Sequence, residues 1–140
     1  MIIKVIASGS SGNATLISDG VTALLLDAGI SIKELERGSG FTLSRVSACL
    51  VTHEHQDHSK ACKDLVKRGI DVYASEGTLQ ALNAEGHRYK AVTATKEFIV
   101  GSFVIMGFGV KHDAAEPLGY LIYSRLTHQK TVYLVDTAYV

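Results

Sequence analysis

The first part of the chain alternates between short apolar runs and glycine-rich polar turns, a pattern typical of β-strands joined by tight loops. Apolar and β-branched residues predict the first strand at 2–7. After a polar loop at 8–13, two further strands are predicted at 14–18 and 21–26. The Asp19-Gly20 pair between these two strands is a strong signal for a β-hairpin.

Helical signals appear in the middle of the chain. Ser31 and Glu34 form a capping-box pattern, which predicts a short helix that runs to about Arg37. The remaining elements expected here are a strand at 47–51, a helix at 60–68 capped by Ser59, a strand at 71–74, and a helix at 76–84 capped by Ser75.

The last part of the chain returns to strand-like runs separated by glycines or polar turns. The order of strands, helices and strands again, without a repeat or a linker, predicts a single α+β domain over residues 1–140. The tyrosines of this part, Tyr133 among them, are interpreted as packing residues. The strands expected here lie at 98–100, 103–106, 118–123 and 131–135.

The composition is that of a globular protein, with 46% hydrophobic and 20% charged residues in 140. No apolar run approaches the ~20 residues that cross a bilayer, and the first residues resemble a strand rather than a signal peptide. We therefore expect no membrane segment and a cytoplasmic location, with Cys49 and Cys62 as reduced, at least half-buried thiols. Fourteen basic and fourteen acidic residues balance, which argues against coating nucleic acid through bulk charge but leaves local contact with a phosphodiester open.

Three histidines and two carboxylates lie within six consecutive residues, from His53 to His58, directly after the predicted strand at 47–51. Neutral imidazole nitrogen and carboxylate oxygen are the ligands that Zn²⁺ and its neighbours prefer. Without a cation, so many titratable groups would repel one another or need heavy solvation. This segment therefore indicates a metal site at the end of the strand.

Three further polar residues follow apolar runs in the same way. Asp27 comes after 23–26, His112 comes shortly after 108–110, and Asp136 comes after 132–135. Taken alone, each would be interpreted as a turn or structural residue. Because strand ends at one edge of a sheet converge in space, their joint occurrence with the histidine segment favours a shared site.

The order of Asp27, the segment His53-Glu54-His55-Gln56-Asp57-His58, His112 and Asp136 resembles the metallo-β-lactamase superfamily over nearly the whole chain. More narrowly, 7–13, 26–31 and 112–114 resemble the YycJ/WalJ-like branch of DNA-directed exonucleases. The resemblance implies an αβ/βα four-layer sandwich. This chain would form its N-terminal half, a mixed β-sheet with flanking helices.

The resemblance also implies a role for each residue of the pattern. Two divalent metal ions are expected, either Zn²⁺ or Mn²⁺, with Fe as a further alternative. Asp27 would not bind metal but would brace the histidine loop from behind. Asp57 and His112 are also the expected catalytic residues. The implied ligands are His53, His55 and His112 for the first metal, Asp57 and His58 for the second, and Asp136 as the bridge between them.

The chain departs from the family pattern in one respect. The family usually supplies a final histidine to the second metal, but this sequence ends at Val140, four residues after Asp136. His87 and His128 precede Asp136 in polar turns and are predicted to be surface residues. The remaining half would belong to a longer product, be absent from a naturally short version, or come from another chain. We therefore expect an open sheet face that an oligomer or a partner chain covers.

Three functional hypotheses follow. Two metals ~3.5–4 Å apart would generate a bridging hydroxide near neutral pH, so the first is a metal-dependent phosphodiesterase, most specifically a DNA exonuclease. The second is a hydrolase of small molecules, such as a cyclic phosphodiester, a thioester or a lactone. The third is a catalytically incomplete binding or assembly half-domain.

Two groups of residues bear on contact with DNA. The loop at 8–13 could cradle a phosphate, and a simple tight turn is the alternative. The predicted helix at 60–68 turns four cations towards solvent, where they could touch a nucleic-acid backbone or merely be solvated. The residues concerned are Ser8, Ser10, Ser11 and Asn13 in the loop, and Lys60, Lys63, Lys67 and Arg68 on the helix.

Overall fold

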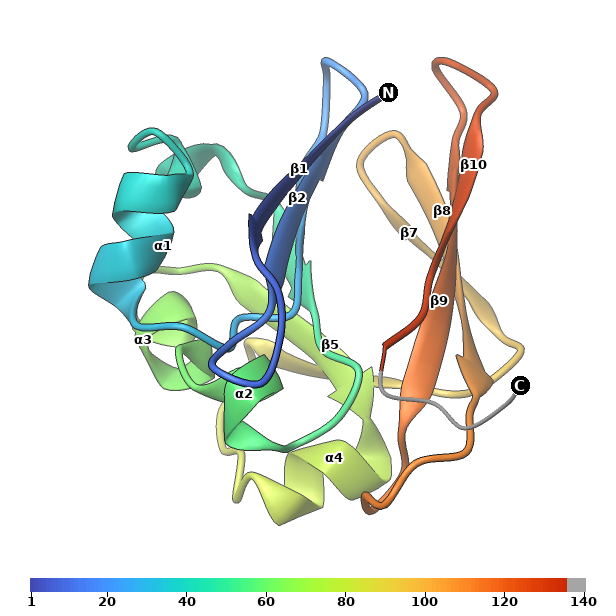
Figure 1. The fold of residues 1–140 in the computed structure, drawn as a ribbon. Helices are drawn as coiled ribbons and strands as arrows, with labels where there is room; N and C mark the ends of the chain where they lie inside the picture. Colours follow the sequence, from blue (N-terminus) through green and yellow to red (C-terminus); the bar gives the residue numbers. More distant parts are fainter. Residues whose placement is uncertain (136–140) are drawn as a thin grey trace.

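The computed structural model describes residues 1–135 and contains two β-sheets packed face to face, with helices on the outer side of the first sheet (Figure 1). The first sheet has six strands in the order β1-β2-β3-β4-β5-β6. Its first three strands are antiparallel, and the pairs from β3 to β6 are parallel. The strands are β1 (Ile2–Ala7), β2 (Ala14–Ser18), β3 (Ala23–Leu26), β4 (Ala48–Leu50), β5 (Asp71–Ser75) and β6 (Tyr89–Val92).

The second sheet is antiparallel throughout, with four strands in the order β10-β9-β8-β7. Its strands correspond to the four runs expected near the end of the chain, with ends shifted by up to three residues. They are β7 (Glu97–Val100), β8 (Phe103–Gly109), β9 (Leu118–Ser124) and β10 (Lys130–Tyr133).

The helices are short. The capping box of the first helix is confirmed, because the Ser31 hydroxyl accepts the Glu34 N–H at 3.2 Å while the Glu34 carboxylate accepts the Ser31 N–H at 3.3 Å. Within residues 1–135, none of these helices has the length and apolar character needed to cross a membrane. The helices are α1 (Ile32–Gly38), the 3-10 helix η1 (Leu43–Arg45), α2 (Gln56–Ser59), α3 (Cys62–Lys67) and α4 (Glu76–Ala81).

The alternation of side chains along the central strands produces two separate cores. Leu24 and Leu26 point towards the second sheet and pack in a cluster with Phe103 and Ile122. Leu25 points the other way, into a cluster beneath the helices. Each fully buried leucine contributes roughly 1.5–3 kcal/mol, so the two cores hold both layers on the first sheet.

The prediction for the middle of the chain contains one error and one omission. Ser59 does not cap a helix, because its hydroxyl donates to the carbonyl oxygens of Glu54 and His55 within a helix that has already begun at Gln56. That helix ends early because the Ala61 N–H donates to a carbonyl of another loop, so α2 and α3 are separate. The strand β6 was also missed, since its charged surroundings hide the alternation of an edge strand.

A buried carboxylate fastens the two sheets together where β2 turns into β3. Asp19 accepts the backbone N–H groups of Val21 and Thr22, at 3.0 and 2.9 Å, and the hydroxyl of Ser124 on β9 at 2.6 Å. It also accepts the hydroxyl of Ser102 from the β7–β8 turn. Burial by itself raises the pKa of the Asp19 carboxyl, but these four hydrogen bonds outweigh it and hold the pKa well below its usual range.

The outer face of the second sheet is open within residues 1–135, as expected. Ile99 and Val132 point away from the first sheet and are 58% and 54% exposed. Between them, Val104, Met106 and Leu121 help to line a shallow cavity of about 380 Å³. In Figure 1 the helices lie on the far side of the first sheet and leave this face uncovered.

Candidate metal centre

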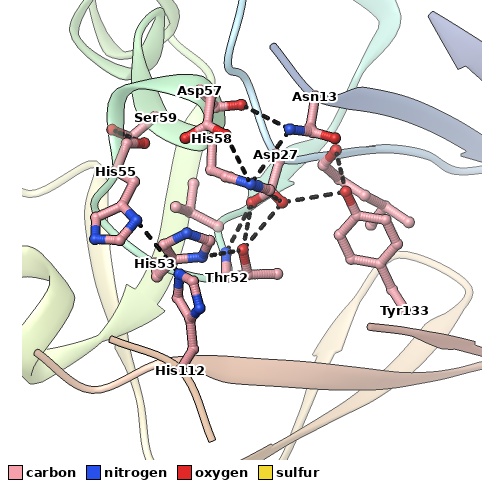
Figure 2. A network of polar contacts seen from close by, with 12 residues as sticks. Asn13, Asp27, Thr52, His53, His55, Asp57, His58, Ser59, His112 and Tyr133 are labelled. Carbon is pink, nitrogen blue, oxygen red and sulfur yellow. Dashed lines mark hydrogen bonds and ion pairs between the residues drawn. The ribbon is translucent and has the colours of Figure 1, made fainter. Parts of the chain in front are cut away.

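The histidine segment lies where the parallel strands β3 and β4 end side by side. Leu26 pairs with Leu50, so Asp27 and Thr52 emerge from neighbouring strands at one edge of the sheet. The Asp27 N–H donates to the Leu50 carbonyl at 2.8 Å while Asp27 takes a left-handed φ of 61°. This strained turn places the Asp27 carboxylate beside Thr52 and His58 (Figure 2).

One group of three imidazoles gathers at the surface of this edge. One nitrogen from each of His53, His55 and His112 lies within 4.8 Å of the others. The His55 Nδ1 and His112 Nε2 atoms are 3.3 Å apart. His112 reaches the group because its loop is fastened to the histidine segment, where the Leu118 N–H donates to the Thr52 carbonyl at 2.9 Å. His112 was expected here from sequence, and the structure brings it to His53 and His55.

A second group lies deeper and shares His53 with the first. One ligand atom each from His53, Asp57 and His58 lies within 4.8 Å of the others. The His58 Nε2 atom is 3.5 Å from the Asp57 Oδ2 atom. Both residues lie on α2, which turns the Asp57 carboxylate and the His58 ring towards the same point.

Asp27 organises both groups from beneath and has no exposed surface. Its Oδ2 atom accepts the His58 Nδ1–H at 2.8 Å, which puts the lone pair of that ring on Nε2. Its Oδ1 atom accepts the Thr52 N–H at 2.8 Å. The Thr52 hydroxyl lies 3.0 Å from Asp27 Oδ2 and 2.9 Å from His53 Nδ1. It therefore links the Asp27 carboxylate to the His53 ring through two hydrogen bonds.

Burial raises the pKa of the Asp27 carboxyl, and the hydrogen bonds from His58 and Thr52 oppose this effect. Tyr133 from β10 supplies a further donor, with its hydroxyl 3.1 Å from Asp27 Oδ2. Burial raises the pKa of the Tyr133 hydroxyl, so it stays protonated as a donor. Tyr133 packs in the core between the sheets, as expected, and its contact with Asp27 was not foreseen.

The loop at 8–13 is fastened to the site by Asn13. The Asn13 N–H donates to the Asp57 carbonyl at 2.8 Å, and its side-chain amide lies 3.3 Å from His58 Nε2. The same amide donates to the Gly9 carbonyl at 2.8 Å, which closes the loop on itself. The predicted phosphate-binding serines Ser8, Ser10 and Ser11 are exposed on this loop, and the structure describes no contact that tests that role.

A glycine permits the close approach of the β3–α1 loop to α2. A Cβ atom on Gly29 would lie 1.7 Å from the Asp57 carbonyl oxygen. The neighbouring Ala28 N–H donates to the His58 carbonyl at 2.9 Å. The Asp27-Ala28-Gly29 stretch therefore supports the backbone of the histidine segment as well as His58 itself.

The other site predictions fall outside the two groups. Asp136, the expected bridging ligand, lies outside the described residues. His87 and His128 are exposed, as expected of surface histidines, and His128 lies 2.9 Å from the Tyr123 hydroxyl. Glu54 was not singled out from sequence, yet its carboxylate accepts the Ala115 N–H at 3.0 Å and ties the His112 loop to the histidine segment. No signal in the sequence marks this pairing.

The residues present fit a divalent metal ion. Ligand atoms at ~2.0–2.1 Å from a tetrahedral Zn²⁺ lie roughly 3.3 Å from one another, which matches the separation of His55 and His112. A buried carboxylate behind two of the imidazoles is the outer support usual for metal-binding histidines. The imidazole and carboxylate donors suit Zn²⁺, Mn²⁺ or Fe.

Comparison with known proteins gives consistent matches. Residues 22–140 match the domain family described as "Beta-lactamase superfamily domain". The chain is 35% identical over 149 residues to "Exodeoxyribonuclease YycJ" of Bacillus anthracis and 33% identical over 152 residues to "Exodeoxyribonuclease WalJ" of Streptococcus pneumoniae. Each alignment covers 98% of this chain and 54% of the relative. The chain thus spans about half the length of the curated relatives it matches.

Solved structures show the same fold. The metallo-beta-lactamase fold protein YhfI of Bacillus subtilis superposes with a TM-score of 0.77 at 18% identity, covering 99% of this chain and 63% of that one. A metallo-beta-lactamase of Cronobacter sakazakii with a HARLDQ motif gives a TM-score of 0.76 at 13% identity, covering 92% of this chain and 54% of that one. At these identities the likeness concerns the fold alone.

Proposed function

Since the chain belongs to the metallo-β-lactamase superfamily and shares the N-terminal half of its αβ/βα sandwich, we propose that it is a metal-dependent hydrolase. The proposed substrate is a phosphodiester, and the proposed activity is that of a DNA exonuclease. The names of the two relatives support this substrate class.

The observation that carries the proposal is the single buried carboxylate behind two imidazoles. Asp27 reaches His58 directly and His53 through the Thr52 hydroxyl. A carboxylate in this place fixes both rings with their protons on Nδ1 and their lone pairs on Nε2. Complete burial of a carboxylate is costly, and its use here is to hold ligand nitrogens in one orientation.

The proposed ligands are divided between two divalent ions. When bound, such ions polarise a phosphoryl oxygen and lower the pKa of water, which supplies a nucleophile near neutral pH. The Asp57 carboxylate, half-buried on α2, would orient the attacking water, and His112 would complete the first ligand set from its position beside His55. The proposed ligands are His53, His55 and His112 for one ion, Asp57 and His58 for the other, and Asp136 between them.

The test is metal content per chain in the purified protein after reconstitution with Zn²⁺ or Mn²⁺, measured by inductively coupled plasma mass spectrometry. We expect close to two ions, with the content falling in His55→Ala and Asp136→Ala. The control is His128→Ala, which removes an exposed histidine remote from the two groups. Equal metal content in His55→Ala and His128→Ala would contradict the proposed site.

The activity is tested on the metal-loaded protein with DNA strands labelled at one end and with bis-p-nitrophenyl phosphate. Hydrolysis of both, abolished in His55→Ala and retained in His128→Ala, supports a phosphodiesterase. Stoichiometric metal without hydrolysis of either substrate would contradict the proposed activity while leaving the metal site standing. Turnover of thioesters or lactones alone would favour a small-molecule hydrolase.

We also propose that the open face of the second sheet is covered in the functional protein by a second copy or by further polypeptide. The exposed side chains of Ile99 and Val132 support this, since exposed apolar patches of this kind mark interaction sites. Light scattering on the purified protein and on Val132→Lys tests it. A monomer in both samples would exclude the second copy.

A cytoplasmic location is proposed from the thiols. Cys49 and Cys62 are both buried and free. Burial raises the pKa of both thiols, that of Cys62 to about 12, so neither forms a thiolate near neutral pH. Free thiols are usual in a reducing compartment. Localisation of a tagged protein in cell fractions tests this.

A further inference from the structure

A polar cavity of about 380 Å³ adjoins the histidine segment on the side of α3 and α4. It is lined by Glu54 and Gln56 of the histidine segment, by the residues that lead into α3, by the start of α3 and by the end of α4. Its volume lies in the range of ligand pockets, ~300–1,000 Å³, which leaves room for a nucleotide. The side chains that matter here are Glu54, Gln56, Lys60, Lys63, Asn83 and Tyr89.

The cavity and the metal centre share one stretch of backbone. His53 and His55 belong to the first imidazole group, whereas Glu54 and Gln56 line the cavity. Successive residues are only about 3.8 Å apart between Cα atoms, so the two sites are immediate neighbours. A strand with one phosphodiester at the metal centre would therefore have its adjoining nucleotides beside this cavity.

The structure divides the basic face of this region into two parts. Lys60 and Lys63 line the cavity, are exposed, and form no ion pair with another described residue. Arg68 is instead paired with Glu36, and Lys67 does not line the cavity. The sequence does not distinguish these four cationic residues. In the structure two of them line the cavity and two do not.

Two carboxylates lie near these lysines, and both already have partners. The Glu54 carboxylate is held at the cavity wall by the Ala115 N–H, at 3.0 Å. The pKa of the Glu34 carboxyl is lowered first by its hydrogen bond from Ser31 and to a lesser degree by Lys60. Lys60 is therefore close to Glu34 but does not form an ion pair with it. Both lysine side chains are therefore available to a ligand in the cavity.

We propose that this cavity binds the sugar–phosphate backbone of a nucleic-acid strand whose neighbouring phosphodiester lies at the metal centre. The proposal rests on the proposed phosphodiesterase function. Lys60 and Lys63 contact successive phosphates, and the amides of Gln56 and Asn83 donate hydrogen bonds to the backbone. Lysine is suited to this because phosphate contacts position a strand without reading its sequence.

The test measures binding without turnover. The metal-loaded protein is titrated into a short fluorescein-labelled single strand of DNA with phosphorothioate linkages, and binding is followed by fluorescence anisotropy. The titration is repeated at salt concentrations from about 50 to about 200 mM. The variants are Lys60→Gln, Lys63→Gln and the double variant, with Lys67→Gln as the matched control on the same helix. Inorganic phosphate, a mononucleotide and a longer unlabelled strand serve as competitors, which distinguishes a strand from a free phosphate ligand.

Each cavity lysine that neutralises a phosphate contributes about 0.7 to the slope of log affinity against log salt for a single strand. We expect the double variant to lose about 1.4 of that slope and to bind on the order of tenfold more weakly, while Lys67→Gln stays close to the unmodified protein. Hydrolysis of bis-p-nitrophenyl phosphate should be unchanged in all of them. Competition by a longer strand should exceed that by phosphate or a mononucleotide.

Equal losses in Lys67→Gln and in the cavity variants would overturn the subsite, since any charge on the helix would then serve. So would unchanged binding in the double variant, or competition by phosphate as strong as by a strand. These outcomes are distinct from failure of the proposed function. That failure would be an absence of hydrolysis in the unmodified metal-loaded protein, whereas binding is measured here on a strand that resists cleavage.

Discussion

Two buried aspartates stand at opposite ends of β3, and they differ in what they bind. Asp19 precedes the strand, and its donors within residues 1–135 are neutral hydroxyl and backbone groups. Asp27 follows the strand and faces an imidazole, a tyrosine hydroxyl and Thr52. The pKa of Asp19 is lowered in spite of burial, whereas burial raises that of Asp27.

The contrast separates a carboxylate that holds the sheets together from one that orients ligands. Asp19 has four donors from the turn and from two elements of the second sheet, which satisfy its charge completely. Asp27 also has four donors, the Thr52 N–H and hydroxyl, the His58 ring and the Tyr133 hydroxyl, but two of them lead to histidines whose orientation matters to a cation. Asp27 has no exposed surface whereas Asp19 is 8% exposed, so both the depth of burial and the partners separate the two roles.

The largest expected effect is that of Asp27→Asn on metal affinity. The amide would present a donor to His58 Nδ1 and so favour the opposite tautomer, with its proton on Nε2. We expect metal affinity to fall ~10–100-fold. Competition titration with a chromophoric chelator measures this, and an affinity within about twofold of the unmodified protein would refute the role given to Asp27.

The next effect is that of Asp19→Asn on folding. Replacing a carboxylate that accepts four hydrogen bonds should lower the free energy of unfolding by about 2 kcal/mol, measured by urea denaturation of the metal-free protein. Metal affinity should not change, because the two aspartates lie at opposite ends of β3. A drop in metal affinity as large as that of Asp27→Asn would break the comparison.

At low pH the free energies of unfolding of Asp19→Asn and the unmodified protein should become equal. The pKa of Asp19 is lower in the folded state than in the unfolded chain, where it is about 3.9. Its stabilising contribution is therefore complete above about pH 4 and is lost as pH falls towards the folded-state value. Urea denaturation of both proteins at a series of pH values should show the difference shrinking below about pH 4. A constant difference would contradict this account.

The smallest effect is expected from Tyr133→Phe. The change keeps the ring in the core between the sheets and removes only the hydroxyl that donates to Asp27 at 3.1 Å. One such hydrogen bond contributes about 1 kcal/mol, so metal affinity should fall about fivefold. Tyr120→Phe, which removes a hydroxyl bonded to the Val51 carbonyl instead, is the control. The same chelator titration applies, and equal effects would assign both tyrosines to packing.

Local signals in the sequence predicted most of the elements. The capping box of Ser31 and Glu34 and the Asp19-Gly20 hairpin depend on neighbours in the chain, and both are present. Ser59 misled because a helix-capping residue can also sit inside a helix, where its hydroxyl bonds to carbonyls of the preceding turn. The break between α2 and α3 depends on the hydrogen bond from the Ala61 N–H to the carbonyl of Ala28, thirty-three positions earlier. A local sequence pattern cannot contain such a distant partner.

The composition of the candidate site and the bracing role of Asp27 were predicted, but the further support from Tyr133 and Glu54 was not. Histidines and aspartates at strand ends are visible in the sequence, and the structure gathers His53, His55, Asp57, His58 and His112 into two groups. Tyr133 and Glu54 reach the site from distant positions through hydrogen bonds. Their contacts depend on how the second sheet and the His112 loop dock, which spacing along the chain does not determine.

The contact of Tyr133 with Asp27 makes the second sheet part of the metal centre. An ion that binds the aligned histidines also favours the state in which β10 is docked. A free ion concentration of 100 times the dissociation constant would stabilise the folded state by about 2.7 kcal/mol. Where metal is scarce, the chain would spend more time with that edge strand detached and open to proteases. Its abundance in a cell would then follow the supply of the ion.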